Sequence, residues 1–142
     1  MSAPPHDDPN IIDEHKVIRR INPIYHVVDD HNRNVRRIST KAYNKSSGPT
    51  EGMSVDLEHS IQSADLNPLL YVVDPTFVGA VYFAAGFLRS QGLWVGSDPI
   101  PDNQHHGQAW LPLEKKSFSN QQTRSLADNA EWYVQIAEVE LR

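Results

Sequence analysis

The longest apolar run in the chain constrains the fold most, because any core must be built around it. Residues 69–88 read LLYVVDPTFVGAVYFAAGFL and nearly reach the roughly 20 residues that a membrane-spanning helix needs. Asp74 and Pro75 interrupt the run, and the apolar stretch after them is too short to span a bilayer. We therefore predict no membrane contact and a segment buried in a globular core.

The residues after Asp74 carry the signals of a helix. Asp74 is a suitable N-cap, Pro75 suits the first helical position, and Gly92 can end a helix in the left-handed conformation. Residues 76–91 between them are apolar nearly all round, which is typical of a helix covered on every side. The pattern predicts a central buried helix.

Shorter segments on both sides are rich in β-branched and aromatic residues, as strands are. Residues 24–30 and 35–43 flank the polar turn HNRN at 31–34, which predicts a β-hairpin. Further predicted strands cover residues 16–21, 53–58, 93–96 and 107–114, and a predicted loop rich in Ser, Gly and Pro covers 45–52.

The C-terminal part predicts an amphipathic helix. Ser119 and Gln122 have the spacing of a capping box, in which each side chain bonds to the other residue's backbone N–H. Apolar residues then recur at steps of three and four, namely Leu126, Ala130, Tyr133, Val134 and Ala137.

These elements predict an α+β fold, with a small, mostly antiparallel sheet around one buried helix and the C-terminal amphipathic helix outside. The chain has 142 residues, which is the size of one domain. Residues 1–10 hold three prolines and few apolar side chains, so we expect a flexible tail there and a single domain over 11–142.

Composition excludes several classes of site. The chain has no cysteine, which rules out disulfides, thiolate zinc sites and cysteine nucleophiles. Its first ten residues lack the basic and apolar regions of a secretory signal, so we expect a cytoplasmic protein. Neither a glycine-rich phosphate loop nor a G-x-S-x-G motif occurs. Whether the chain is an enzyme stays open at this point.

Charge is distributed unevenly along the chain. The net charge is −5, yet residues 16–45 hold eight basic and two acidic residues, a local charge of +6. Such a block predicts a directed contact with an anion rather than general attraction to nucleic acid. Neighbouring side chains on a strand point to opposite faces, so one of each pair would face a given ligand. The candidate ligand-binding residues are Arg19, Arg20, Arg36 and Arg37.

Two alternatives for these arginines stay open. They can pair with the acidic residues of the same chain, or protect a sheet edge from aggregation. His105 and His106, in a polar turn, are further ligand-binding candidates, and either imidazole has the chemistry of a general base. The histidines lack the spacing of metal ligands, so we predict no metal site.

The order Arg20, Ser39-Thr40 and then Glu51 or Glu58 resembles that of ADP-ribosyltransferase-like folds. The resemblance implies that Arg20 holds the phosphates of NAD, that Ser39 braces the nicotinamide pocket and that Glu51 or Glu58 is the catalytic acid. Those folds usually place the glutamate on a later strand, where this chain has Gln108. NAD is a cofactor under this alternative; otherwise we expect none.

The segments RRINP, ISTKAY, GMSVDLE and DPIPDNQHH, in this order within residues 17–110, are also similar to small uncharacterised bacterial proteins. That resemblance implies no activity. We expect a small soluble binding or accessory protein whose basic hairpin contacts a phosphate-bearing ligand or an acidic partner protein, with nucleic acid less favoured. The two alternatives are the NAD-linked transferase and a structural subunit of a larger assembly.

Overall fold

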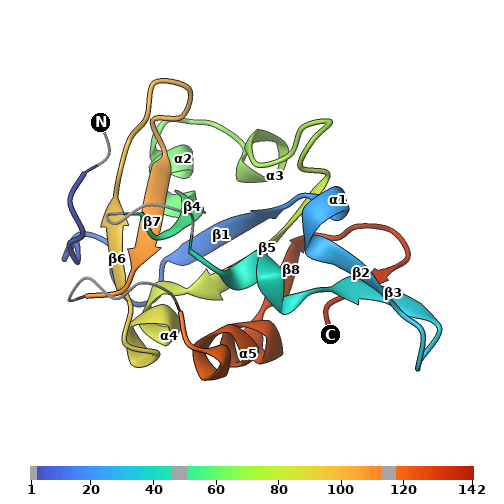
Figure 1. Cartoon of the computed structure of the whole chain (residues 1–142). Coiled ribbons are helices and arrows are strands. Elements are labelled where there is room, and N and C mark those ends of the chain that lie inside the picture. The colour runs from blue at the N-terminus through green and yellow to red at the C-terminus, as the bar shows by residue number, and fades with distance from the viewer. Residues whose placement is uncertain (1–2, 46–50, 113–117) are drawn as a thin grey trace.

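The computed structural model describes residues 3–45, 51–112 and 118–142 and has the predicted α+β class (Figure 1). Most of the loop predicted for 45–52 and the end of the strand predicted for 107–114 lie outside the described residues. The strands of the main sheet are β1 (Lys16–Ile21), β4 (Met53–Leu57), β5 (Gly79–Ala84), β6 (Trp94–Ser97), β7 (His106–Trp110) and β8 (Glu131–Val134). Their order is β6-β7-β4-β1-β5-β8, with every neighbouring pair antiparallel, as predicted.

A second, three-stranded sheet contains the predicted hairpin. Strand β2 (Val27–Asp30) pairs antiparallel with β3 (Val35–Ile38), so the hairpin is confirmed, with shorter strands than expected. Asn34 closes the turn at a φ of 54°, in the left-handed region that asparagine tolerates. Near the C-terminus, β9 (Val139–Glu140) pairs in parallel with β3.

The central helix predicted over 76–91 is wrong. Its middle forms β5, which pairs with β1 on one side and β8 on the other, and a helix, α4 (Ala85–Ser90), forms only after it. An apolar pattern on all sides fits a strand covered on both faces as well as a buried helix. Val81 and Phe83 pack into one core cluster, whereas Ala80 packs into the other.

The helix signals around this strand have other roles. Asp74 Oδ1 accepts hydrogen bonds from the backbone N–H groups of Thr76 (2.7 Å) and Phe77 (2.8 Å). It therefore stabilises a turn before β5 and caps no helix. Gly92 follows α4 with a φ of 81°, the left-handed conformation that was predicted for it.

Helices cover both faces of the main sheet (Figure 1). On one face, α4, the short helix η1 (Thr40–Tyr43) and α5 (Asn120–Asn129) contribute Leu88, Tyr43 and Leu126 to the larger core cluster. On the other face, α2 (Glu58–Ser63) and α3 (Pro68–Tyr71) cover the smaller cluster, which includes Ile18 and Ile61. A short helix, α1 (Pro23–His26), precedes the hairpin. Within the described ranges, no helix is both long and apolar enough to cross a membrane.

The C-terminal helix begins as predicted but ends earlier. Ser119 and Gln122 form the complete capping box at the start of α5. The backbone becomes extended at Ala130, and the next four residues form β8. Tyr133 and Val134 therefore lie on a strand and not on the predicted helical stripe. The run Trp-Tyr-Val is rich in residues that favour strands, and pairing with β5 is available to it.

Residues 3–8 run beside β6. The backbone N–H of Asp8 donates to Val95 O (2.9 Å), and Asp7 Oδ1 accepts from the N–H of Val95 (2.9 Å). The N–H of Ala3 donates to Asp98 Oδ1 (2.7 Å). These contacts give the unpaired side of β6 hydrogen-bond partners. That residues 1–10 form a flexible tail stays a prediction.

Candidate functional site

Arg19 and Arg20 have different surroundings, as the alternation along a strand predicts. Arg19 Nε donates to Ala42 O (2.8 Å) and its Nη1 donates to Ser54 O (2.9 Å). Burial lowers the pKa of Arg19 to about 10. The guanidinium of Arg19 thus links η1 to β4 through hydrogen bonds to their backbone carbonyls. These bonds use its donors within the fold.

The same region contains a histidine that folding keeps neutral. The Nδ1 of His26 accepts a hydrogen bond from the backbone N–H of Asn22 (3.0 Å). Burial, followed by the positive charge of Arg19, lowers the pKa of His26 from 6.5 to about 4. Below pH 6.5 the unfolded chain binds a proton that the folded protein does not. Stability that is fully present above this pH is therefore lost as the pH falls towards 4.

We expect His26 to account for about 2 kcal/mol of the stability lost on acidification, allowing for its partial exposure. His26→Asn keeps an oxygen acceptor near the N–H of Asn22 but has no titrating group. Its free energy of unfolding should therefore fall less than that of the wild type between about pH 7 and about pH 4. Urea denaturation at both pH values measures the difference. Equal acid losses in the two proteins would contradict the assignment.

Arg20 begins a connected polar network on the other face of β1. Its Nε and Nη2 donate to the carboxylate of Asp56 at 2.7 and 3.2 Å, and Asp56 is only 3% exposed. Asn103 Nδ2 donates to the same carboxylate (2.6 Å), and Asn103 Oδ1 accepts from the hydroxyl of Tyr71 (2.6 Å). The guanidinium of Arg20 also lies over the Tyr71 ring, 5.6 Å from its centroid. Arg20 is therefore engaged by the protein's own carboxylate.

His105 joins this network, whereas His106 has other partners. The backbone N–H of His105 donates to Asn103 Oδ1 (3.0 Å), and Nδ1 of the His105 ring lies 2.7 Å from Ser60 Oγ. The Nδ1 of His106 lies 2.7 Å from Asp98 O. Adjacent side chains on an extended backbone diverge, as these do. Across the described part of the chain, no three His, Asp or Glu side chains are placed to hold a metal ion.

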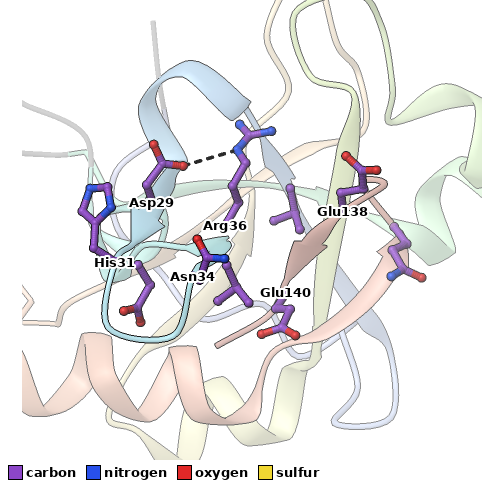
Figure 2. A pocket seen from close by; sticks show the side chains of 10 residues that line it. Asp29, His31, Asn34, Arg36, Glu138 and Glu140 are labelled. Carbon is purple, nitrogen blue, oxygen red and sulfur yellow. Dashed lines mark ion pairs between the residues drawn. The ribbon is translucent and has the colours of Figure 1, made fainter.

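Arg36 and Arg37 line different pockets on the hairpin. Arg36 lines an open pocket of about 640 Å³, in which its Nε lies 3.8 Å from Asp29 Oδ1 (Figure 2). Four carboxylates line the same pocket, from Asp29, Asp30, Glu138 and Glu140. One guanidinium among four carboxylates makes this side of the hairpin unsuitable for an anion.

Arg37 lines a second pocket, of about 360 Å³, formed by the hairpin, α5 and the C-terminal residue. We name it the arginine pocket. The hydrogen bond from Arg37 Nε (3.1 Å) is the largest cause that lowers the pKa of Asp30, the carboxylate beside it. Arg124 is exposed, and its guanidinium has no ion pair with any described residue. The charged side chains that line the pocket are Arg33, Arg37, Arg124, Arg142, Asp30 and Asp128, and Thr40 adds a hydroxyl.

Backbone carbonyls hold two of these arginines in place. Arg142 Nη1 donates to Ala127 O (3.2 Å) and Ala130 O (3.0 Å), both on or next to α5. Arg37 Nη1 donates to the neighbouring Ile38 O (3.3 Å). Both guanidinium groups also have a carboxylate partner, since Arg37 Nε lies 3.1 Å from Asp30 Oδ2 and Arg142 Nη2 lies 3.7 Å from Glu131 Oε1. Their positive charges are therefore partly neutralised.

Sequence reasoning missed Arg124 and Arg142. They lie far along the chain from the basic block, and they reach the hairpin because α5 packs near η1 and β9 pairs with β3. The one signal available was the polar face of the predicted C-terminal helix, on which Arg124 lies.

The three residues proposed beside Arg20 for NAD chemistry have separate structural contacts. Ser39 Oγ accepts a backbone N–H in the first turn of η1, and Glu51 Oε2 accepts from Gln108 Nε2 (3.3 Å). Glu58 Oε2 accepts from the hydroxyl of Tyr133 (2.6 Å). Burial, and then this bond, raises the pKa of Tyr133. The use of NAD stays a prediction.

Comparison of the chain with known protein families, with curated proteins and with solved structures found no match. The two resemblances drawn from the sequence therefore stay predictions. The function has to be inferred from the geometry of the sites themselves.

Proposed function

We propose that this chain binds a phosphate-bearing ligand in the arginine pocket. The observation that carries the proposal is that four guanidinium groups line one open cavity and that one of them, Arg124, has no carboxylate partner among the described residues. The other three each have such a partner, namely Asp30, Glu140 or Glu131. Guanidinium groups form paired, charge-assisted hydrogen bonds with phosphate oxygens. Arg124 contributes a positive charge that no described side chain neutralises by an ion pair.

The size and lining of the pocket fit a small ligand. Its volume of about 360 Å³ lies in the range of small-molecule sites. The hydroxyl of Thr40 can donate to a phosphate oxygen beside the guanidinium groups. A concave site also favours a projecting phosphate group over a flat acidic protein surface. NAD contains a pyrophosphate, so the NAD cofactor of the alternative function can be tested at the same pocket.

Calorimetric titration with inorganic pyrophosphate tests the proposal. Arg124→Ala should raise the Kd about tenfold, because it removes one charge-assisted contact. Arg124 has no ion pair among the described residues, so its removal should leave the fold intact. Arg36→Ala is the matched control, since it removes the same charge from the other pocket of the hairpin. It should change the Kd by less than about twofold, because solvent and salt screen distant charges.

The binding should also weaken as salt concentration rises, as contacts between exposed charges do. An equal loss of affinity in Arg124→Ala and Arg36→Ala would show that binding depends on the overall charge of the protein and not on the arginine pocket. Wild-type protein that binds neither pyrophosphate nor NAD would contradict the proposal outright.

A further inference from the structure

A short contact joins a serine and a histidine that are distant in sequence. Ser60 lies on α2, and its Oγ is 2.7 Å from Nδ1 of His105, in the turn before β7. When the ring proton is on Nε2, Nδ1 accepts a hydrogen bond from the serine hydroxyl. A hydroxyl that donates to a neutral imidazole has the arrangement of a nucleophile beside its general base.

The Arg20 network described above holds the backbone of His105, and the Tyr71 ring of that network contacts the imidazole. The backbone N–H of His105 donates to Asn103 Oδ1, and Asn103 in turn donates to the buried carboxylate of Asp56. The ring of Tyr71 contacts the imidazole edge-on, with centroids 5.2 Å apart and planes at 76°. The turn that carries His105 is thus fixed on two sides, which a general base requires for its position.

Ser60 also lines a pocket, whereas His105 is not part of the lining and contacts Ser60. The pocket has a volume of about 180 Å³ and lies where α2, the start of β1 and the N-terminal segment meet. Ile11 and Leu57 form apolar parts of its wall. Lys16 supplies a positive charge, and the stacked rings of His15 and His59 (centroids 4.3 Å apart) complete this side of the lining. Burial lowers the pKa of His15, which favours its neutral form.

We propose that Ser60 is a nucleophile that His105 activates for the hydrolysis of small esters bound in this pocket. Ser60 Oγ forms a bond with the carbonyl carbon of the ester while its proton passes to Nδ1 of His105. The bond between this carbon and the leaving oxygen then breaks, and the proton on Nδ1 transfers to that oxygen to release an alcohol. Water, deprotonated by the same imidazole, attacks the acyl carbon and the bond from this carbon to Ser60 Oγ breaks. The proton on Nδ1 returns to Ser60 Oγ, and a carboxylic acid is released.

The carbonyl oxygen becomes negative when the serine attacks, and a nearby positive charge stabilises it. Lys16 lines the pocket and can supply this charge if its Nζ, which lies 4.6 Å from the centroid of the Tyr82 ring, turns towards the substrate. Asp8 also lines the pocket, so an uncharged ester suits it better than an anionic one. The small volume limits the substrate to a short acyl group, such as acetyl. This site uses residues other than those of the arginine pocket, so the two proposals succeed or fail independently.

Covalent labelling with a fluorophosphonate tests the proposal, because this reagent forms a stable bond with activated serines. We expect one adduct on the wild-type protein by intact mass spectrometry, and peptide mapping should place it on Ser60. Ser60→Ala should give no adduct. Ser63→Ala is the matched control on the same helix, since the exposed Ser63 hydroxyl donates to His59 O, and it should be labelled like the wild type.

His105→Gln tests the role of the base. We expect it to slow labelling at Ser60 by at least about a hundredfold, and p-nitrophenyl acetate hydrolysis by a similar factor. Thermal melts of each variant check that it is folded. If His105→Gln does not fold, the comparison of labelling between Ser60→Ala and Ser63→Ala still identifies the nucleophile. Three results would overturn the proposal: an unlabelled wild type, an adduct on another residue, or unchanged labelling of folded His105→Gln.

Discussion

Replacing Asp56 with alanine should lower the free energy of unfolding by about 3 kcal/mol. The carboxylate is 3% exposed and accepts hydrogen bonds from both Arg20 and Asn103. Without it, the Arg20 side chain, which is 22% exposed, loses its charged partner, and the amide of Asn103 loses its acceptor. Asp74 lies 3.8 Å from Arg20 and is too distant to replace the two short bonds.

Urea denaturation followed by tryptophan fluorescence measures this loss. Asp29→Ala is the control, because Asp29 is 67% exposed and lies 3.8 Å from Arg36. Its removal should cost less than about 1 kcal/mol, as for other exposed pairs. Similar small losses in the two variants would show that the network around Arg20 contributes little to stability.

Gln108→Glu should destabilise the protein by about 3 to 5 kcal/mol at neutral pH. Gln108 is fully buried, and its Nε2 donates to Asp98 Oδ2 (2.6 Å) and Glu51 Oε2 (3.3 Å). The substitution replaces this donor by a third carboxylate between two others. ADP-ribosyltransferase-like folds usually place a glutamate on the segment that holds Gln108 here, and the two neighbouring carboxylates disfavour a glutamate at this position.

The destabilisation should shrink as the pH falls. Burial and the two neighbouring carboxylates would raise the pKa of the introduced carboxyl above its value of about 4.3 in the unfolded chain. The folded variant then binds more protons than its unfolded chain between those two values, so its stability rises as the pH is lowered through this range.

Gln104→Glu makes the same chemical change on an exposed residue of the turn before β7. It should cost less than about 0.5 kcal/mol, and the cost should depend little on pH. Urea denaturation of both variants at about pH 5 and about pH 8 separates the two cases. An equal loss for Gln108→Glu at both pH values would contradict the explanation by buried charge.

Elements that depend on local pattern could be predicted from the sequence. The hairpin around residues 31–34 and the capping box of Ser119 and Gln122 were both found in the structure. The segment 79–84 was misassigned because pairing with the neighbouring strands, and not its own sequence pattern, determines that it is a strand and not a helix. Strand β1 lies some 60 residues earlier and supplies the hydrogen-bond partners that make it a strand.

The sites divide in the same way. The alternation along a strand separated Arg36 from Arg37, and the structure places them in different pockets. Arg124 and Arg142 could not be assigned to a pocket, because their place depends on the parallel pairing of β9 with β3. Likewise, the contact of Ser60 with His105 spans 45 residues and has no counterpart in a local motif.

The strand order of the main sheet also governs how the protein is made. Strand β1 is the first of these strands to be synthesised, yet it lies near the middle of the sheet between β4 and β5. The ribosome must therefore add more than sixty residues after Ile21 before β5 is complete and β1 has both partners. Until then, β1 can pair only with β4, and Val17, Ile18 and Ile21 lack the part of the sheet that β5 supplies. Closure of the sheet is thus a late, long-range event, of the kind that leaves apolar strands exposed while the chain is still incomplete.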